Sequence, residues 1–314
     1  MQKIGVVLAI YNGEKYLTEF LESLKFQTRK PDFIFAIDDA SADNSVSILE
    51  TFKKDLPIEI FQSKKNQGHL KTFCKGLEIA AEKLDKNDFI ALADQDDIWL
   101  ENKLEILEKE FAENQTDVVF GDAEVIDGKG NLICSSWRKF SNIQTEISVK
   151  HEIAGINQLS GCMSLFKVSF LEKVLPIPES ILVHDRWISA VALKNKGLKA
   201  ISEPVILYRI HSANAIGINK VSLSETLKNQ ILLAKAFLEN KERLCLNASE
   251  ISFAKKLVKL SEARRSRLFV FETLPWIFKE RRFLFLKENA FRTFLKVLFS
   301  AVGLPLAKKI FHKN

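Results

Sequence analysis

The segment FIALADQDDIWL, residues 89–100, decides the fold. Its first five residues are apolar, which is typical of a parallel strand that helices cover on both faces. Three carboxylates follow at the carboxyl end of this strand, on Asp94, Asp96 and Asp97. Buried carboxylates in such close succession repel one another and lose hydration, so we expect a cation among them.

The chemistry of these side chains indicates which cation would bind. Oxygen ligands suit Mg2+ or Mn2+, and such ions usually hold the phosphates of a substrate as well. The alternative is a solvated acidic turn in which Asp97 caps the helix that follows. The rest of the chain has to decide between these two interpretations.

Strand-like and helix-like segments alternate around this motif. We expect strands over residues 4–10, 33–37, 58–61, 89–93 and 117–120, and helices over residues 14–26, 45–53, 68–84 and 101–113. This alternation predicts an α/β fold with a doubly wound, mostly parallel sheet and helices on both faces. Such sheets bind ligands at the carboxyl ends of their strands, where residues 11–13, 38–39 and 94–97 would face one crevice.

The pattern after residue 121 is less regular. The sequence DGKGN at residues 127–131 predicts a hairpin turn, residues 184–196 predict a helix that Gly197 ends, and residues 204–210 predict a last strand. From about Ser222 onward the pattern is almost wholly helical. We therefore expect one α/β domain over residues 1–220 and a helical region over residues 221–314.

Composition excludes several classes of protein. The chain has 314 residues, of which 46% are hydrophobic and 27% charged, so it is globular rather than disordered. It contains no apolar run of about 18 residues, so we expect no transmembrane helix. Its N-terminus looks like a first strand and not a signal peptide.

Four scattered cysteines match no metal or redox spacing, and we expect reduced thiols in a cytoplasmic protein. They are Cys74, Cys134, Cys162 and Cys245.

Charge is concentrated at the C-terminal end. Residues 251–314 carry a net charge of +11, with 15 Lys or Arg and 4 Asp or Glu, while the whole chain carries +6. Because large apolar residues alternate with these cations, we expect amphipathic helices that lie on the inner face of the cell membrane. The alternative is a helical bundle that packs on the first domain or on a second subunit. Nucleic-acid binding is not expected, because the rest of the chain is acidic and no recognition motif is present.

Seven short motifs occur in order over residues 4–217. They are VLAIYNG at 7–13, SLxxQT at 23–28, DDASADNS at 38–45, NQG at 66–68, DQDDIW at 94–99, HDRW at 184–187 and YRIHSAN at 208–214. Together they resemble the family 2 glycosyltransferases of the GT-A fold, most closely a rhamnosyltransferase-like branch. Each motif alone is weak, but the ordered set is specific.

The resemblance implies that the ends of the first two strands bind a nucleotide. Ile10, Tyr11 and Asn12 would lie at the base and ribose, with the Tyr11 ring offering a face to a pyrimidine. Asp39 would accept a hydrogen bond from the base, and Asp38 would contact base or ribose. The alternative is that Asp38 or Asp39 caps the helix that follows, a role that we expect of Asp43 in any case.

The resemblance also implies a metal site. Asp96 would bind Mn2+ or Mg2+ directly, and Asp94 would contact the ribose or the metal's surroundings, while Asp97 would support the loop or cap the next helix. Arg209 and His211 belong to the motif that closes the site, so that Arg209 would contact the donor and His211 the metal or the diphosphate. A packing role for His211 stays open.

The resemblance assigns the catalytic base to Asp185. Family 2 enzymes invert the anomeric carbon by direct displacement, so one carboxylate must take the proton of the acceptor hydroxyl. Burial near Trp187 would raise the pKa of Asp185, and Arg186 would lower it if it turned inward. Residues 161–163 match a segment on the acceptor side, although simple packing is an alternative there.

These residues imply transfer of a single sugar in the synthesis of a cell-surface polysaccharide. The Gln-x-x-Arg-Trp motif of processive members is absent. We expect dTDP-rhamnose as donor and a glycan or lipid-linked acceptor, and a homodimer is one of the assemblies left open. One alternative is a nucleotidyltransferase, which would need a Gly-rich loop with a basic residue where this chain has Tyr11–Glu14. The other is a membrane-associated sugar-binding scaffold without catalysis.

Overall fold

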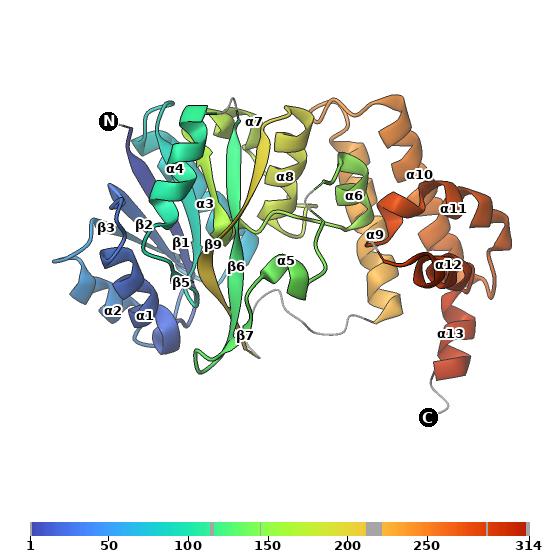
Figure 1. Cartoon of the computed structure of the whole chain (residues 1–314), viewed down its shortest axis with the longest axis horizontal. Helices are drawn as coiled ribbons and strands as arrows, with labels where there is room; N and C mark the ends of the chain where they lie inside the picture. The colour runs from blue at the N-terminus through green and yellow to red at the C-terminus, as the bar shows by residue number, and fades with distance from the viewer. Residues whose placement is uncertain (1, 114–115, 145, 212–221, 287, 312–314) are drawn as a thin grey trace. The chain divides into compact units, whose positions relative to one another are not determined.

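A computed structural model of the chain describes residues 2–113, 116–144, 146–211, 222–286 and 288–311 (Figure 1). Residues 212–214 of the seventh motif therefore lie outside the described residues. The chain divides into two compact units. Unit 1 comprises residues 1–141, 159–177 and 183–217, and unit 2 comprises residues 142–158, 178–182 and 218–314. The single boundary near residue 220 expected from the sequence would place residues 142–158 and 178–182 in the first domain, whereas they belong to unit 2.

The first half of unit 1 is a parallel sheet of four strands in the order β3-β2-β1-β4. Its elements are β1 (Ile4–Ile10), α1 (Glu14–Lys25), β2 (Phe33–Asp38), α2 (Ser45–Phe52), β3 (Ile58–Gln62), α3 (His69–Lys83) and β4 (Phe89–Asp94). Ile10 pairs with Asp38, and Ala9 pairs with Asp94. This register brings the polar residues after β1, β2 and β4 to one edge of the sheet.

Helices cover both faces of these strands because the buried side chains alternate. Val6, Leu8 and Ile10 share one hydrophobic core with Leu17 and Phe20 of α1. Their neighbour Val7 points to the opposite face, where it lies against Gly76 of α3. Every residue of β1 is buried. The apolar runs therefore form central strands, as the sequence predicted.

The second half of unit 1 makes the sheet mixed. Its elements are β5 (Ile98–Trp99), α4 (Lys103–Glu113), β6 (Val118–Asp127), β7 (Leu132–Cys134), α5 (Trp137–Phe140), η1 (Gly161–Met163), β8 (Ser164–Lys167), η2 (Val168–Phe170), α7 (Leu171–Val174), α8 (His184–Lys194) and β9 (Leu198–Ile210). β8 runs antiparallel between β4 and β6, whereas β6 and β9 are parallel. β5 pairs antiparallel with β9, and this pairing joins the chain after Asp97 to the strand that leads to His211.

Several predicted boundaries needed correction. β6 extends to Asp127 rather than ending at residue 120, and β9 begins at Leu198 rather than at residue 204. Both strands are longer because they pair with each other over most of their length. The hairpin turn is confirmed, since the Asp127 carboxylate accepts hydrogen bonds from the backbone N–H groups of Lys129 and Asn131.

Unit 2 is helical in its described residues. It contains α6 (Val149–Ala154), α9 (Leu223–Glu239), α10 (Ala248–Ser266), η3 (Phe271–Thr273), α11 (Leu274–Leu284), α12 (Ala290–Phe299) and α13 (Leu304–Phe311). Leu260, Val270, Ile277 and Val297 form a small core of this unit. No helix in the described part of the chain is both long enough and apolar enough to cross a membrane.

Candidate active site

The backbone of Tyr11 is held in place by Gln95. The Gln95 side chain accepts a hydrogen bond from Tyr11 N and donates one to Tyr11 O, both at 2.9 Å. A Cβ atom on Gly13 would lie 2.3 Å from Gln95 Oε1, so the close approach needs glycine there. Tyr11 as a residue is 48% exposed. The residue predicted to stack on a base therefore has a fixed backbone and is partly open to solvent.

The loops after β1 and β2 are tied to each other. Ser41 Oγ accepts a hydrogen bond from Asn12 N, and Asn12 Oδ1 accepts one from Ala42 N, each at 2.9 Å. Asn12 and Ala40 adopt φ values of 48° and 62°, in the left-handed region that few residues with a side chain occupy. Such strain persists only where surrounding contacts enforce it, and it often accompanies ligand binding. The side chain of Asn12 thus stabilises the loop that the sequence assigned to the nucleotide.

Asp43 lies where these loops enter their helices. Its carboxylate accepts hydrogen bonds from Glu14 N at 3.0 Å and from both the backbone and the hydroxyl of Ser45. Burial would raise the pKa of Asp43, but the hydrogen bonds from Ser45 and Glu14 outweigh it and lower that pKa. The capping role expected of Asp43 is what its contacts show.

Asp38 and Asp39 are both buried at the end of β2. The Asp39 carboxylate accepts hydrogen bonds from the backbone N–H groups of Gln67 and Gly68, at 2.8–3.1 Å, in the loop before α3. Asp38 accepts two longer ones, of 3.3 Å, from Ser41 N. Neither residue caps α2. Asp39 therefore already accepts hydrogen bonds from two backbone donors. The contacts of Asp38 and Asp39 with base and ribose stay predictions.

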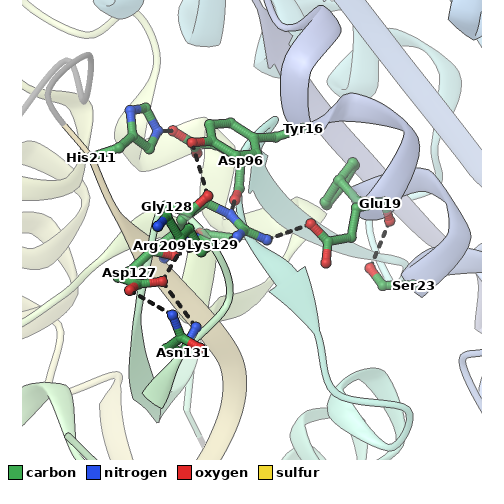
Figure 2. A network of polar contacts seen from close by, with 12 residues as sticks. Tyr16, Glu19, Ser23, Asp96, Asp127, Gly128, Lys129, Asn131, Arg209 and His211 are labelled. Atoms are coloured by element: carbon green, nitrogen blue, oxygen red, sulfur yellow. Dashed lines mark hydrogen bonds and ion pairs between the residues drawn. The ribbon is translucent and has the colours of Figure 1, made fainter. Parts of the chain in front are cut away.

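Two of the three carboxylates after β4, those of Asp94 and Asp96, each lie beside a histidine. Asp96 Oδ2 is 2.8 Å from His211 Nε2, and the His211 ring packs against Tyr16 with centroids 4.9 Å apart. Figure 2 shows these three side chains together. Asp94 Oδ1 lies 3.5 Å from Nε2 of His69, the first residue of α3. The structure thus brings the two predicted metal ligands, Asp96 and His211, together.

Burial and neighbouring carboxylates leave the negative charge at this motif only partly compensated. Burial and then the Asp94 carboxylate raise the pKa of Asp96, although His211 lowers it in part. Burial raises the pKa of Asp97 well above its usual range. Asp97 accepts a hydrogen bond from Arg209 N at 3.1 Å, and no described residue donates a well-aligned one to its Oδ2, which lies near the Cys162 thiol. Asp97 supports the loop, and α4 begins too far along the chain for it to act as the cap.

Arg209 is buried and engaged within the protein. Its side chain donates to the backbone oxygen of Asp96 at 2.8 Å and to the Glu19 carboxylate at 2.6 Å, and it lies over the ring of Tyr16 (Figure 2). Only 2% of the residue is exposed. The structure therefore shows Arg209 fixing the position of Asp96. Its predicted contact with the donor stays a prediction, and the sequence could not show that Glu19 reaches its guanidinium.

Asp185 lies in the first turn of α8 beside His184 and Gly161. His184 Nε2 is 2.6 Å from Asp185 Oδ1, although the two atoms are not aligned for an ideal hydrogen bond. Burial would raise the pKa of Asp185, but the charge of His184, aided by His69, lowers it. A Cβ atom on Gly161 would lie 2.6 Å from Asp185 Oδ1, so this approach needs glycine. The neighbour that lowers the pKa of Asp185 most is thus His184, for which the sequence suggested no such role.

His69 and His184 link the two acidic groups. Their rings lie 5.3 Å apart, and His184 stacks on Phe73 with centroids 4.1 Å apart. Burial would lower the pKa of His69, but contact with Asp94 and the charges of Asp185 and Asp96 raise it. The sequence did not predict a role for His69 or for the Gln95 clamp. Only the position of His69, directly after the NQG motif, offered a signal.

The residues around Asp96 fit a hard divalent cation. Asp96 and His211 would offer a carboxylate oxygen and an imidazole nitrogen that lie 2.8 Å apart, the Asp94 charge is close to Asp96, and the raised pKa of Asp96 marks a negative charge that a cation would stabilise. Asp94, Asp97 and Cys162 also hold ligand atoms within 4.8 Å of one another. Burial raises the pKa of the Cys162 thiol well above its usual range, however, so it stays protonated and is a poor ligand for such a cation.

The model of the Glycosyl transferase family 2 matches residues 5–175 of this chain. The dTDP-rhamnosyl transferase RfbG of Shigella flexneri is 29% identical over 228 residues, which cover 68% of this chain and 74% of RfbG. Residues 5–175 include the aspartates at the ends of β2 and β4.

Two solved structures share the fold. Residues 1–349 of S. aureus TarS, in complex with UDP-GlcNAc, give a TM-score of 0.60 at 18% identity and cover 96% of this chain and 82% of that chain. The mannosyltransferase PcManGT from Pyrobaculum calidifontis, in complex with GDP-Man and Mn2+, gives 0.51 at 15% identity over 99% and 88% of the two chains. The predicted GT-A fold is confirmed.

Proposed function

The chain belongs to glycosyl transferase family 2, and from this membership and the geometry of its site we propose that it transfers one sugar, with inversion, from a nucleotide-diphosphate sugar to an acceptor hydroxyl. One observation carries the proposal. The half-buried cluster of Asp94 and Asp96 with His211, and the pair of His184 with Asp185, lie on one connected set of side chains. An acidic turn whose only role was to cap a helix would not need a link through histidines to a further carboxylate, Asp185.

The nucleotide occupies the ends of β1 and β2 in this proposal. The exposed ring of Tyr11 stacks on the base, while Ile10 and Asn12 form the floor beside it. Asp38 and Asp39 contact the base and ribose through lone pairs that their backbone partners leave free, since an ionised carboxylate accepts up to about four hydrogen bonds. The clamp from Gln95 supports this assignment, because it fixes Tyr11 without covering its ring.

Asp96 and His211 would hold Mn2+ or Mg2+ in this proposal, with the Asp94 carboxylate nearby. The cation, when bound, neutralises the charge that develops on the departing diphosphate. PcManGT was solved with Mn2+ and a nucleotide sugar, which supports a cation of this type in a related fold. Arg209 contributes indirectly, because it fixes the backbone of Asp96.

Asp185 acts as the general base. The acceptor oxygen attacks the anomeric carbon, the bond from that carbon to the diphosphate oxygen breaks, and Asp185 takes the hydroxyl proton as the new bond forms. The lowered pKa of Asp185 keeps it ionised at neutral pH, which a base requires. His184 and His69 position this carboxylate and the neighbouring Asp94.

The donor in this proposal is dTDP-rhamnose, and the acceptor is a glycan or lipid-linked sugar of a cell-surface polysaccharide. The likeness to RfbG, which is named a dTDP-rhamnosyl transferase, supports this donor. Residues 1–220 would carry catalysis, and the basic helices of residues 221–314 would attach the enzyme to the inner face of the membrane or join two copies. Such attachment would bring the site close to a lipid-linked acceptor.

Thermal shift across a panel of nucleotide sugars, with and without Mn2+, tests the proposal. We expect a rise in Tm with dTDP-rhamnose that requires Mn2+, followed by slow release of rhamnose by hydrolysis. A response to another nucleotide sugar would change the donor but keep the function. A response to none would contradict the proposal, and binding without hydrolysis or transfer to any acceptor would favour a sugar-binding scaffold.

A further inference from the structure

α12 of unit 2 turns its apolar face outward. Phe291, Phe294, Leu298 and Phe299 are 69%, 51%, 42% and 61% exposed, and we call these four residues the α12 face. Their spacing of three, four and one residues places them on one side of a helix. In an ordinary surface helix of a folded domain this side would be buried.

The opposite side of α12 already packs against unit 2. Val297 is 4% exposed and belongs to the small core with Leu260, Val270 and Ile277. Asn289 caps the helix by accepting a hydrogen bond from Arg292 N. α12 is therefore anchored in unit 2, and exposure of its apolar face is not a sign of a detached helix.

The stretch of chain that contains this face is rich in cations. Residues 264–300 contain nine Lys or Arg and three Asp or Glu. On α12 itself Arg292 is exposed, and Lys296 pairs with Glu288 at 2.8 Å. Two copies meeting through the same face would bring like charges together, which opposes association. Anionic lipid headgroups complement the cations, and acyl chains can accept the aromatic rings.

We infer that the α12 face inserts into a bilayer that contains anionic lipids. The phenyl rings enter the boundary between headgroups and acyl chains, while Arg292 and the neighbouring cations contact the headgroups. This inference names the contact surface of the attachment proposed above. It rests on the α12 face alone, so it can hold or fail independently of sugar transfer.

Vesicle sedimentation of the full chain tests this inference. We expect binding to vesicles of phosphatidylcholine with phosphatidylglycerol, weaker binding to phosphatidylcholine alone, and weaker binding at high salt. The double variant Phe291→Ser/Phe294→Ser should bind the anionic vesicles at least about tenfold more weakly, because two rings no longer leave water. The matched control is Phe26→Ser, an equally exposed phenylalanine of unit 1, which should bind as the parent does.

Further measurements separate the possible outcomes. Since both rings are exposed, the double variant should keep the Tm and the Mn2+-dependent donor binding of the parent. A Phe294→Trp variant should show a blue shift of its emission when anionic vesicles are added. Undiminished vesicle binding by the double variant would overturn the inference. The inference would also be overturned if the parent bound no vesicle but formed a dimer, while the double variant remained a monomer. The α12 face would then bind a second copy of the chain rather than a bilayer.

Discussion

The strands β2 and β4 both end in consecutive or near-consecutive aspartates, yet the two ends differ in what satisfies the charge. After β2, Asp39 receives hydrogen bonds from two backbone N–H groups at 2.8–3.1 Å. After β4, Asp96 faces another carboxylate and a histidine, and burial raises its pKa. The same sequence pattern thus produces an anion that backbone donors compensate at one strand end and an anion that is only partly compensated at the other.

This difference distinguishes a carboxylate that stabilises the fold, such as Asp39, from one that a bound cation would stabilise, such as Asp96. Backbone donors stabilise a carboxylate permanently, so Asp39 stabilises the fold whether or not a donor is bound. Like charges and burial destabilise Asp96 until a cation arrives. Removing the charge should therefore have opposite effects on stability at the two ends, whatever it does to activity.

The largest expected effect concerns Asp185. Asp185→Asn should lower kcat by about 10²- to 10⁴-fold, because the amide cannot take the acceptor proton. Donor binding with Mn2+ should persist, as thermal shift would show. Asp55→Asn, at the protein surface, is the control for activity. Unchanged transfer by Asp185→Asn would remove this residue as the base.

The next test asks whether Arg209 positions Asp96 or contacts the diphosphate of the donor. Arg209→Met should destabilise the ligand-free protein by about 1–3 kcal/mol, because the backbone oxygen of Asp96 and the Glu19 carboxylate lose their donor. This corresponds to a fall in Tm of several degrees, measurable by calorimetry. If Arg209 served mainly the diphosphate, the variant would keep its Tm and lose only donor affinity.

Asp39→Asn should lower the Tm of the ligand-free protein by a few degrees. The amide removes the charge that the two backbone N–H groups stabilise, and its own NH2 group would face them if it turned. Chemical denaturation would give the loss directly. An increase in stability would mean that the β2 end is as strained as the β4 end and would abolish the contrast between them.

The pH dependence of stability gives a smaller but signed effect. Because the pKa of Asp96 is raised in the fold, the metal-free protein loses stability as the pH rises from about 4 through that raised value. The gain in Tm from Asp96→Asn should therefore be largest near neutral pH and vanish as the pH falls toward about 4.

Asp127→Asn provides the opposite case. Hydrogen bonds from Asn131 and Lys129 lower the pKa of Asp127, so its contribution is present at neutral pH and is lost as the pH falls. This variant should be less stable than the parent at neutral pH and equal to it in acid. Parallel pH profiles for the two variants would contradict the assignment of the charges.

The sequence predicted the first four strands and their helices to within a few residues, because each is a local apolar or periodic run. It did not predict the antiparallel insertion of β8 or the two-residue strand β5, because both depend on pairing between distant segments. The motifs led to Asp94, Asp96, Asp185 and His211. His69 was missed because its partners are 25 and 115 residues away, and the amphipathic pattern of α12 could not show which side faces outward.

The contrast is tested most directly by the Tm of Asp96→Asn, measured without metal and with Mn2+ plus donor at neutral pH. The account predicts that the variant is more stable than the parent without metal, and that Mn2+ with donor raises the Tm of the parent but not that of the variant. A variant that is less stable without metal, or that gains as much as the parent from Mn2+ and donor, would contradict the claim that the charge of Asp96 is only partly compensated until a cation binds.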